Sequence, residues 1–233
     1  MQNIQQRVQH VLDKIHLAAT QYQRSQQPIQ LLAVSKTQPA ERLLEAYQAG
    51  HRAFGENYLQ EAREKQEALS ALEIEWHFIG PIQSNKTREI AEHFQWVHSV
   101  DRLKIAKRLS EQRPKSLPPL SICLQVNIDN EASKSGVNLQ ALPQLAKEIE
   151  HLPNITLRGL MAIPAKKETF AAQRSTFARL TQARDQLQAS IPSLTLDTLS
   201  MGMSDDLEAA IAEGATIVRV GSAIFGPRQY STQ

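Results

Sequence analysis

The sequence contains a single cysteine, so the chain cannot form an internal disulfide. Cys123 lies in the apolar stretch "LSICLQVNI", which predicts a buried thiol in a protein of a reducing compartment. No run approaches the roughly 18 apolar residues that a membrane-spanning helix needs. The N-terminus, "MQNIQQRVQHVLDKI", is too polar for a signal peptide. We therefore expect a cytoplasmic protein that does not act at a membrane.

The sequence also lacks an excess of positive or negative charge. The chain has 26 lysines and arginines and 24 acidic residues, and this balance does not indicate nucleic-acid binding. The seven histidines are scattered, and none shows the paired spacing with a carboxylate, as in HExxH, that holds a metal on a helix. We therefore expect no metal site, and we interpret His77 as a pocket or core residue and His98 as a structural one.

Short apolar or β-branched runs alternate with helical patterns along nearly the whole chain. We expect strands over residues 31–36, 52–57, 75–80, 96–100, 121–128, 156–163, 197–202 and 217–221. Strands that alternate with helices predict a parallel sheet, and a count of eight predicts a closed barrel. An open doubly wound sheet would carry a glycine fingerprint after its first strand, and "LLAVSKTQPA" has none.

We therefore predict an α/β fold in which residues 1–233 form a single (β/α)8 TIM barrel. An additional helix over residues 1–25 is expected to pack on this barrel. Gly50 and Gly214 follow two of the helical patterns, at the position where a residue with positive φ ends a helix. No stretch with the composition of a linker divides the chain into two domains.

Barrel proteins place their functional residues at the carboxyl ends of the strands. The predicted strand ends bring together residues that are far apart in the sequence: Lys36, Asn57, His77, Asn127, Met161, Ser200, Arg219, Gly221 and Ser222. Lys36 follows the apolar run "LLAV". Its stem could pack on the barrel while its amine reaches water. Alternatively, desolvation in the mouth lowers the pKa of such an amine and lets it attack a carbonyl to form a Schiff base.

The eighth strand pattern, "IVRVGSAIFG", puts an arginine inside the barrel and then exposes backbone. Arg219 needs an acceptor, from an acidic side chain or from a ligand, because it keeps its proton. Gly221 allows a ligand to approach the main chain, and Ser222 adds a hydroxyl. The seventh strand pattern adds Ser200 and Ser204, although Ser204 also suits a helix N-cap. Phosphate sites of TIM barrels often occupy these two loops.

A Schiff-base amine and a phosphate site at one mouth indicate a phosphorylated aldehyde. Pyridoxal 5'-phosphate has both groups, and Arg219 could meet its ring nitrogen. Taken singly, each of these residues also has an ordinary structural explanation, and only their combination favours this cofactor.

Seven motifs occur in order along the chain: "AVSKTQP", "FGENYLQE", "WHFIGPIQSNK", "SKSG", "GLMAI", "LSMGMSDDLEAAI" and "VRVGSAIFG". Together they closely resemble the pyridoxal phosphate homeostasis protein family, also called YggS-type, which is similar in fold to the N-terminal barrel of alanine racemase. The resemblance covers nearly the whole chain.

The resemblance implies that pyridoxal 5'-phosphate forms a Schiff base with Lys36 and that Arg219 meets the ring nitrogen. It implies a phosphate site made by Ser200, Gly221 and Ser222. It also implies contacts to the ring and its oxygen from Asn57, His77 and Met161.

The resemblance further implies a role in cofactor homeostasis without robust catalysis. An arginine at the ring nitrogen blocks its protonation, which weakens the ring as an electron sink. Only residues 222–233 follow the eighth predicted strand, so we expect no second domain that closes the mouth and supplies a base. We predict a monomeric carrier that buffers the cofactor or delivers it to apo-enzymes.

Delivery requires that a second amine can attack the Schiff base. Lys134 in "EASKSGVN" and Lys86 in "QSNKTRE" are candidates, and either could instead be an ordinary surface lysine. The alternative function is a racemase or related amino-acid enzyme that takes a base, such as Tyr58 or Tyr230, from a partner subunit. An aldolase would need a carboxylate or tyrosine base that the predicted strand ends do not offer. A module that senses cofactor loading is the third alternative.

Overall fold

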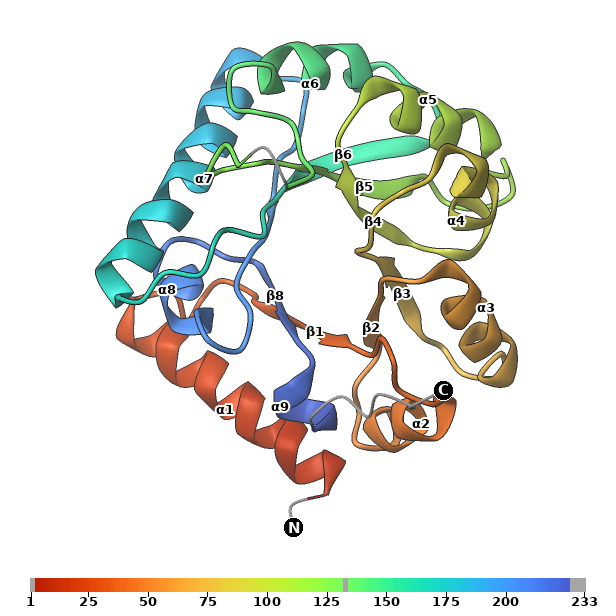
Figure 1. Cartoon of the computed structure of the whole chain (residues 1–233), viewed down its shortest axis with the longest axis vertical. Helices are drawn as coiled ribbons and strands as arrows, with labels where there is room; N and C mark the ends of the chain where they lie inside the picture. The colour runs from red at the N-terminus through yellow and green to blue at the C-terminus, as the bar shows by residue number, and fades with distance from the viewer. Residues whose placement is uncertain (1–2, 132–133, 227–233) are drawn as a thin grey trace.

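The computed structural model describes residues 3–131 and 134–226 of the chain. Its strands are β1 (Gln30–Val34), β2 (Ala53–Glu56), β3 (Glu75–Phe78), β4 (Trp96–Val100), β5 (Leu120–Gln125), β6 (Ile155–Met161), β7 (Thr198–Ser200) and β8 (Ile217–Val220). All are parallel and pair in chain order, and β1 closes the ring by pairing with β8 (Figure 1). The predicted α/β fold, a TIM barrel with an additional N-terminal helix, is confirmed. That it forms one domain over residues 1–233 stays a prediction.

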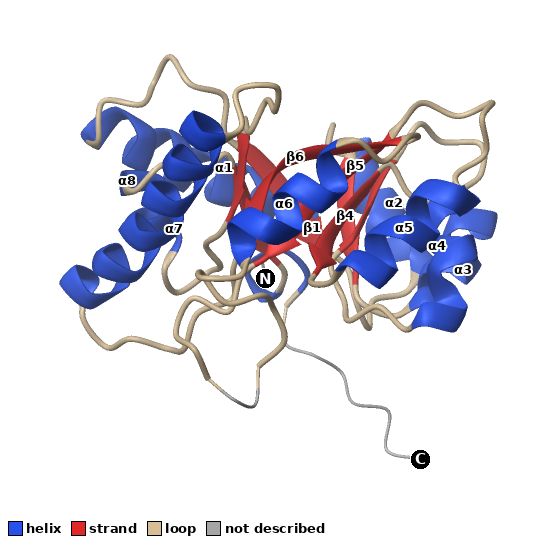
Figure 2. Ribbon diagram, turned by 90° about the horizontal axis from the view of Figure 1, so that it is seen from above, coloured by secondary structure: helices blue, strands red, loops and turns tan. Residues whose placement is uncertain are grey.

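Helices lie on the outside of the strands, on both sides of them in the view of Figure 2. They are α1 (Ile4–Gln21), α2 (Ala40–Gln48), α3 (Leu59–Ala68), α4 (Thr87–His93) after the 3-10 turn Ser84–Lys86, α5 (Leu103–Gln112), α6 (Leu142–Glu150), α7 (Phe170–Ser190), α8 (Leu207–Ala212) and α9 (Ser222–Phe225). Gly50 and Gly214 have φ values of 93° and 105°, which confirms that they end helices as predicted.

The N-terminal helix is shorter than the predicted range of 1–25. Asn3 caps α1, because its side chain accepts a hydrogen bond from the N–H of Gln6 at 2.8 Å. The helix ends at Gln21, with Tyr22 as its C-cap, and residues 1–2 lie outside the described residues. Figure 1 shows α1 along the side of the barrel, where it contacts α2, α8 and α9. Its buried face consists of aliphatic residues at helical spacing, which is why it packs there.

The layer between strands and helices is the main hydrophobic core. Trp76 and Phe78 of β3 and Phe54 of β2 point outward into it, and Leu43 of α2 belongs to the same core from the helix side. Alternate residues of a strand face opposite sides, so the residues between these point into the barrel. A second and much smaller apolar cluster, of Leu32, Ala53 and Ile217 with Ile79 packed against it, lies in the interior. Most of the apolar burial, and therefore most of the hydrophobic stabilisation, lies outside the ring of strands.

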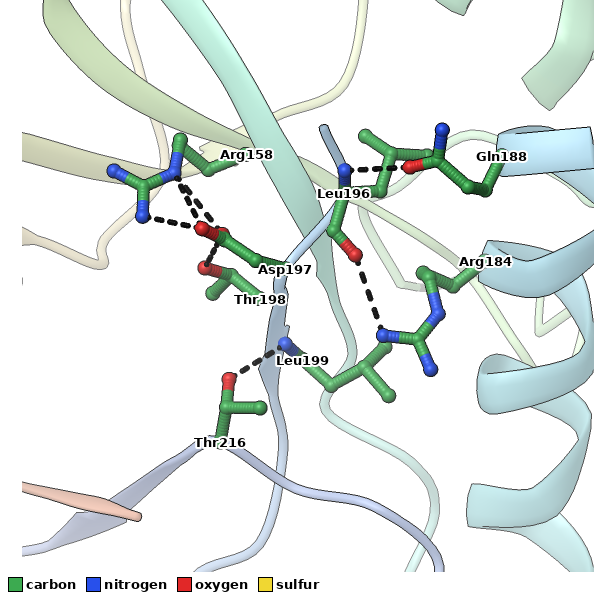
Figure 3. A network of polar contacts seen from close by, with 8 residues as sticks. All are labelled: Arg158, Arg184, Gln188, Leu196, Asp197, Thr198, Leu199 and Thr216. Atoms are coloured by element: carbon green, nitrogen blue, oxygen red, sulfur yellow. Dashed lines mark hydrogen bonds and ion pairs between the residues drawn. The ribbon is translucent and has the colours of Figure 1, made fainter. Parts of the chain in front are cut away.

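Several strands end earlier than predicted. β5 stops at Gln125 rather than residue 128, and β7 covers only Thr198–Ser200 of the predicted 197–202. Gly202 has a φ of 94°, which a strand does not accommodate. β7 is nevertheless held from both sides (Figure 3): the N–H of Leu199 donates to Thr216 Oγ1 at 2.9 Å, and Arg158 pairs with Asp197 at 2.6 Å. A short strand is thus kept in register by its neighbours.

Polar side chains occupy the inside of the barrel. His98 of β4 hydrogen-bonds to Ser200 of β7 at 2.7 Å, and because these strands are not neighbours in the ring, the contact crosses the interior. Arg219 of β8 joins them there. Cys123 is fully buried, as predicted for a core thiol, and burial raises the pKa of its thiol to about 12.

Candidate cofactor site

A cavity of about 440 Å³ opens at the carboxyl ends of the strands, within the size range of small-molecule sites. Five of the predicted site residues line it together: Lys36, Asn57, Arg219, Gly221 and Ser222. They come from the ends of β1, β2 and β8, which are neighbours in the ring. Closure of the barrel therefore brings together residues that are up to 186 positions apart in the sequence.

Lys36 lies in a turn whose preceding residue, Ser35, is fixed by hydrogen bonds to β2. β1 ends at Val34, and Ser35 donates its N–H to the carbonyl of Gly55 at 3.0 Å and its hydroxyl to Glu56 at 2.6 Å. Thr37 has a φ of 63°, so the chain turns sharply there. Lys36 itself is half-buried and lines the cavity, whereas its neighbour Ser35 is buried on the helix side.

A buried ion pair fixes the other side of this turn. Lys65 of α3 donates to the carbonyl of Ser35 at 2.7 Å, to Glu56 at 2.7 Å and to Glu61 at 2.5 Å. Glu56 is fully buried, and burial raises the pKa of its carboxyl against the opposing effect of the Lys65 charge. This cluster sits outside the barrel, so it positions the strand end that bears Lys36 without reaching the cavity.

Asn57 lines the cavity and has a side-chain acceptor without a partner among the described residues. Its Oδ1 is buried and accepts no hydrogen bond from any described residue. A buried polar atom without a partner is costly, and a ligand that donates a hydrogen bond there would remove that cost. The backbone of Asn57 is fixed by Gly80, because a Cβ at Gly80 would lie 2.0 Å from the Asn57 carbonyl oxygen. The glycine of "WHFIGPIQSNK" thus allows the close approach of two loops.

Arg219 reaches the cavity from within the barrel. It is 4% exposed, and three of its N–H groups are used: Nη1 donates to the carbonyl and the hydroxyl of Ser200 at 2.6 and 2.7 Å, and Nη2 donates to the carbonyl of Ala162 at 2.9 Å. Burial lowers the pKa of Arg219 to about 10, so it stays protonated at neutral pH. Its acceptors are neutral, and the charge of Asp206 in the cavity wall opposes the effect of burial.

Two serines and a glycine complete the wall near α9. Gly221 lies close to β1, since a Cβ on it would come within 3.1 Å of the Val34 carbonyl oxygen. Ser222 is exposed to the cavity, and Ser204 also lines it. Ser204 does not cap α8, because the N-cap position is Asp206, whose carboxylate accepts from the N–H of Met203 at 2.6 Å. Two hydroxyl groups, of Ser204 and Ser222, therefore belong to residues of the cavity wall.

Three predicted site residues do not line the cavity. His77, Met161 and Ser200 are fully buried in the barrel, where alternation along the strands points them inward beneath the mouth. The hydroxyl of Ser200 is engaged by His98 and Arg219. Asn127 is also elsewhere, since its amide donates to the carbonyls of Glu131 and Lys134 and holds that loop.

The two predicted transfer lysines lie away from the cavity wall. Lys134 pairs with Glu131 at 2.9 Å, and Lys86 lies 3.9 Å from Glu89. Two other lysines, Lys166 and Lys167, do line the cavity, and sequence reasoning missed them. Their signal was position alone: "AKK" follows "GLMAI" after a single proline, Pro164, so it had to lie beyond the carboxyl end of β6.

Of the two tyrosines considered as bases from a partner subunit, the structure describes Tyr58 but not Tyr230. Tyr58 is 56% exposed at the start of α3, next to the cavity residue Asn57. Tyr230 lies outside the described residues. In the described segments, no group of three or more metal-binding side chains converges, and no helix is long and apolar enough to cross a membrane.

A second hollow of about 500 Å³ lies on the outside of the barrel between α6 and α7. It is lined by helix residues such as Leu142, Lys147 and Gln186. No strand end contributes to it, so the cavity with Lys36 is the candidate functional site.

The sequence profile described as "Alanine racemase, N-terminal domain" matches residues 12–229. The pyridoxal phosphate homeostasis protein of Pseudomonas aeruginosa is 60% identical over 230 residues, which cover 99% of this chain and 98% of that protein. Among solved structures, PipY of Synechococcus elongatus PCC7942 without PLP is 40% identical to this chain, with a TM-score of 0.85. The match covers 96% of this chain and 100% of the PipY chain. The same protein has been solved with PLP bound (TM-score 0.83, 38% identity, 96% and 100% covered).

The alanine racemase of Corynebacterium glutamicum shares the fold alone. It is 19% identical with a TM-score of 0.67, and the match covers 95% of this chain but 63% of the racemase. By contrast, the homeostasis proteins match this chain from end to end at 50–60% identity in several bacteria. The chain therefore belongs to the family of pyridoxal phosphate homeostasis proteins, within the group that shares the alanine racemase N-terminal domain.

Proposed function

We propose that this protein binds pyridoxal 5'-phosphate as a reversible Schiff base at Lys36 and buffers or delivers it. When bound, the aldehyde of this cofactor condenses with a lysine amine and releases water, and hydrolysis reverses the bond. The proposal is supported by the cavity, which is lined by a lysine, a buried arginine, two serines and an asparagine with an unpartnered acceptor. The relative solved with PLP bound gives the proposal its cofactor.

The cavity residues match the groups of the cofactor by their chemistry. Ser222, Ser204 and the backbone at Gly221 suit a phosphate, and the unpartnered Oδ1 of Asn57 suits a hydroxyl donor. Arg219 donates hydrogen bonds and keeps its own proton, so we assign it to the ring nitrogen. His77, Met161 and Ser200 support this site from beneath in our proposal, rather than by contact with the cofactor.

The observation that carries the proposal is the position of Lys36 in the cavity, and trapping tests it. The purified chain is incubated with pyridoxal 5'-phosphate, reduced with borohydride, and digested for peptide mapping. We expect a visible absorption band before reduction and the label on the peptide that contains Lys36. Lys36→Ala should lose both signals.

Lys167→Ala is the matched control, because Lys167 is a second lysine of the same cavity. This variant should keep the band and the label at Lys36. A label that moves to Lys166 or Lys167 in the unmodified chain would contradict the assignment, and a colourless protein that does not bind the cofactor would contradict the function.

We propose a carrier rather than a racemase. The relatives that match the whole chain are named homeostasis proteins, whereas racemases match over part of their own length. A protonated arginine at the ring nitrogen disfavours the build-up of negative charge in the ring that racemisation needs. Incubation of the loaded protein with L-alanine should produce no D-alanine at a rate above that of free cofactor, and sustained racemisation would overturn this point.

Delivery to apo-enzymes is the part of the proposal that involves partners. The loaded chain, mixed with an apo-enzyme that depends on the cofactor, should restore its activity faster than hydrolytic release alone allows. Lys134→Ala tests the predicted transfer route and should slow delivery without changing the label at Lys36, with Lys86→Ala as its counterpart. Equal delivery by both variants and the unmodified chain would rule out these lysines. We propose that the carrier is a cytoplasmic monomer, which light scattering checks for the oligomeric state.

A further inference from the structure

A row of hydrogen bonds runs through the barrel to Arg219. Glu75 Oε1 lies 2.8 Å from His77 Nε2, His77 Nδ1 lies 2.9 Å from His98 Nε2, and His98 Nδ1 lies 2.7 Å from Ser200 Oγ. Ser200 Oγ in turn accepts from Arg219 Nη1 at 2.7 Å. The row links β3, β4, β7 and β8, so it crosses the interior from one wall to the other.

The two ends of the row lie at opposite ends of the barrel. Glu75 is the first residue of β3, and its side chain is 39% exposed. Arg219 lines the cavity at the carboxyl ends of the strands. His77, His98 and Ser200, which connect them, are fully buried. A partly exposed carboxylate at the amino ends of the strands is therefore connected to the candidate cofactor site by side chains that exclude water.

The chemistry of the two ends sets the direction of every bond. An ionised Glu75 can only accept, so His77 carries its proton on Nε2 and accepts at Nδ1. His98 must then donate from Nε2 and accept at Nδ1, which leaves the Ser200 hydroxyl to donate to His98 and to accept from Arg219. Burial lowers the pKa of both imidazoles, which favours these neutral forms. All donors point from the cation toward the anion, an arrangement in which each bond polarises the next.

The last member of this row, Ser200, also accepts hydrogen bonds that fix the Arg219 guanidinium. Nη1 is bound by the carbonyl and hydroxyl of Ser200, and Nη2 by the carbonyl of Ala162. The remaining two N–H groups, on Nε and Nη2, make no hydrogen bond to the described residues. Rotation of the Ser200 hydroxyl away from His98 would place two donors against each other at Nη1, so His98 keeps the acceptor side of Ser200 toward the guanidinium.

We propose that Glu75, His77, His98 and Ser200 form a relay of positioning residues that orients Arg219 toward the cofactor, so that the amino-terminal end of the barrel influences cofactor binding at the other end. The inference rests on the proposed function, because it assigns Arg219 to the bound cofactor. None of the relay residues before Arg219 lines the cavity, and each acts through its neighbour.

The test measures the dissociation constant and the visible absorption maximum of bound pyridoxal 5'-phosphate. His98→Leu interrupts the relay at its centre. It should weaken binding about tenfold, because the Ser200 hydroxyl loses the acceptor that keeps its lone pairs toward Arg219, and it should shift the absorption maximum. His98→Asn retains a donor and an acceptor and should restore part of the loss. Ser200→Ala interrupts the last link with a smaller change in volume and should resemble His98→Leu.

Glu75→Gln is the decisive variant, since Glu75 is partly exposed and does not reach the cavity. Removal of its charge should raise the dissociation constant about two- to threefold and move the absorption maximum in the same direction as His98→Leu. Cys123→Ala, a buried interior change outside the relay, should alter neither quantity. Borohydride should label Lys36 in every variant.

The outcomes separate this inference from the proposed function. If the unmodified chain does not bind the cofactor, the proposed function fails. If it binds, and His98→Leu, Ser200→Ala and Glu75→Gln all bind with unchanged affinity and absorption maximum, the relay is overturned while the function stands. A His98→Leu chain that does not fold leaves Ser200→Ala and Glu75→Gln to decide the question.

Discussion

The barrel interior and the layer between strands and helices are both buried, but they contain very different side chains. The outer layer is apolar almost throughout, with Phe54, Leu43 and Trp76 as typical members, and its one buried ion pair among the described residues is Lys65 with Glu56. The interior instead contains a hydrogen-bonded row that ends at Arg219. Apolar burial makes the outer layer the source of stability, whereas the polar interior orients groups at the mouth.

The two buried cations near the site, Lys65 and Arg219, also differ in the charge of their partners. Lys65 is neutralised by carboxylates, so its role ends within the outer layer. Arg219 is held by neutral oxygens, lines the cavity, and has two N–H groups that make no hydrogen bond to the described residues. A buried cation with neutral partners at a cavity still attracts an anion or an acceptor, which distinguishes Arg219 from Lys65.

The largest effect is expected from the ion pair of the outer layer. Lys65→Met leaves Glu56 buried without its cation, and breaking such a pair from one side costs about 3–5 kcal/mol of unfolding free energy. Urea denaturation measures the loss. Lys86→Met removes a half-exposed lysine 3.9 Å from Glu89 and should change stability by less than about 0.5 kcal/mol. Equal stability of the two variants would show that the buried pair contributes nothing.

A smaller effect is expected where the outer layer meets the mouth. Gly80→Ala places a Cβ 2.0 Å from the Asn57 carbonyl oxygen, so one of the two loops must move. The cost should be about 1–3 kcal/mol, and the displaced Asn57 should weaken cofactor binding as well. Gly50→Ala is the control, because it has open space but a φ of 93°, and it should lower stability by about 1 kcal/mol without any effect on binding. Unchanged binding in Gly80→Ala would remove Asn57 from the site.

The smallest effect is expected from the pH dependence of the two interior histidines, His77 and His98. Burial lowers the pKa of His77 and His98 below the ordinary value of 6.5, so both rings should stay neutral at pH 6, with the proton on Nε2. Nitrogen NMR of the rings measures this directly. The unfolded chain binds these protons more readily as pH falls below about 6.5, so the two histidines lower stability there by at most about 1.4 kcal/mol each per pH unit.

Glu56 acts in the opposite sense. Its raised pKa means that the folded chain binds this proton more tightly, so its contribution to stability grows as pH falls. The ring spectra separate the two effects, because they report each histidine by itself. Two imidazolium spectra at pH 6 would contradict both the lowered pKa values and the direction of the relay.

Much of the site was predictable because it follows directly from strand ends. Lys36 comes after an apolar run, and Asn57 and Gly221 follow two other runs, so any closed barrel brings them to one mouth. Lys166 and Lys167 could have been found by the same rule. The exclusion of His77, Met161 and Ser200 from the cavity could not be predicted without knowing at which residue each strand leaves the sheet, since these side chains face the interior but lie below the cavity lining.

The order of apolar runs and helical patterns by itself determined the eightfold barrel and the lysine at its mouth, because these depend on local periodicity and on the number of units. The sequence alone did not determine that His98 meets Ser200, 102 positions later, or that the oxygen of Asn57 is left without a donor. Those contacts lie across the barrel or between its loops, and they exist only after the last strand pairs with the first. Only the closed tertiary structure could decide them.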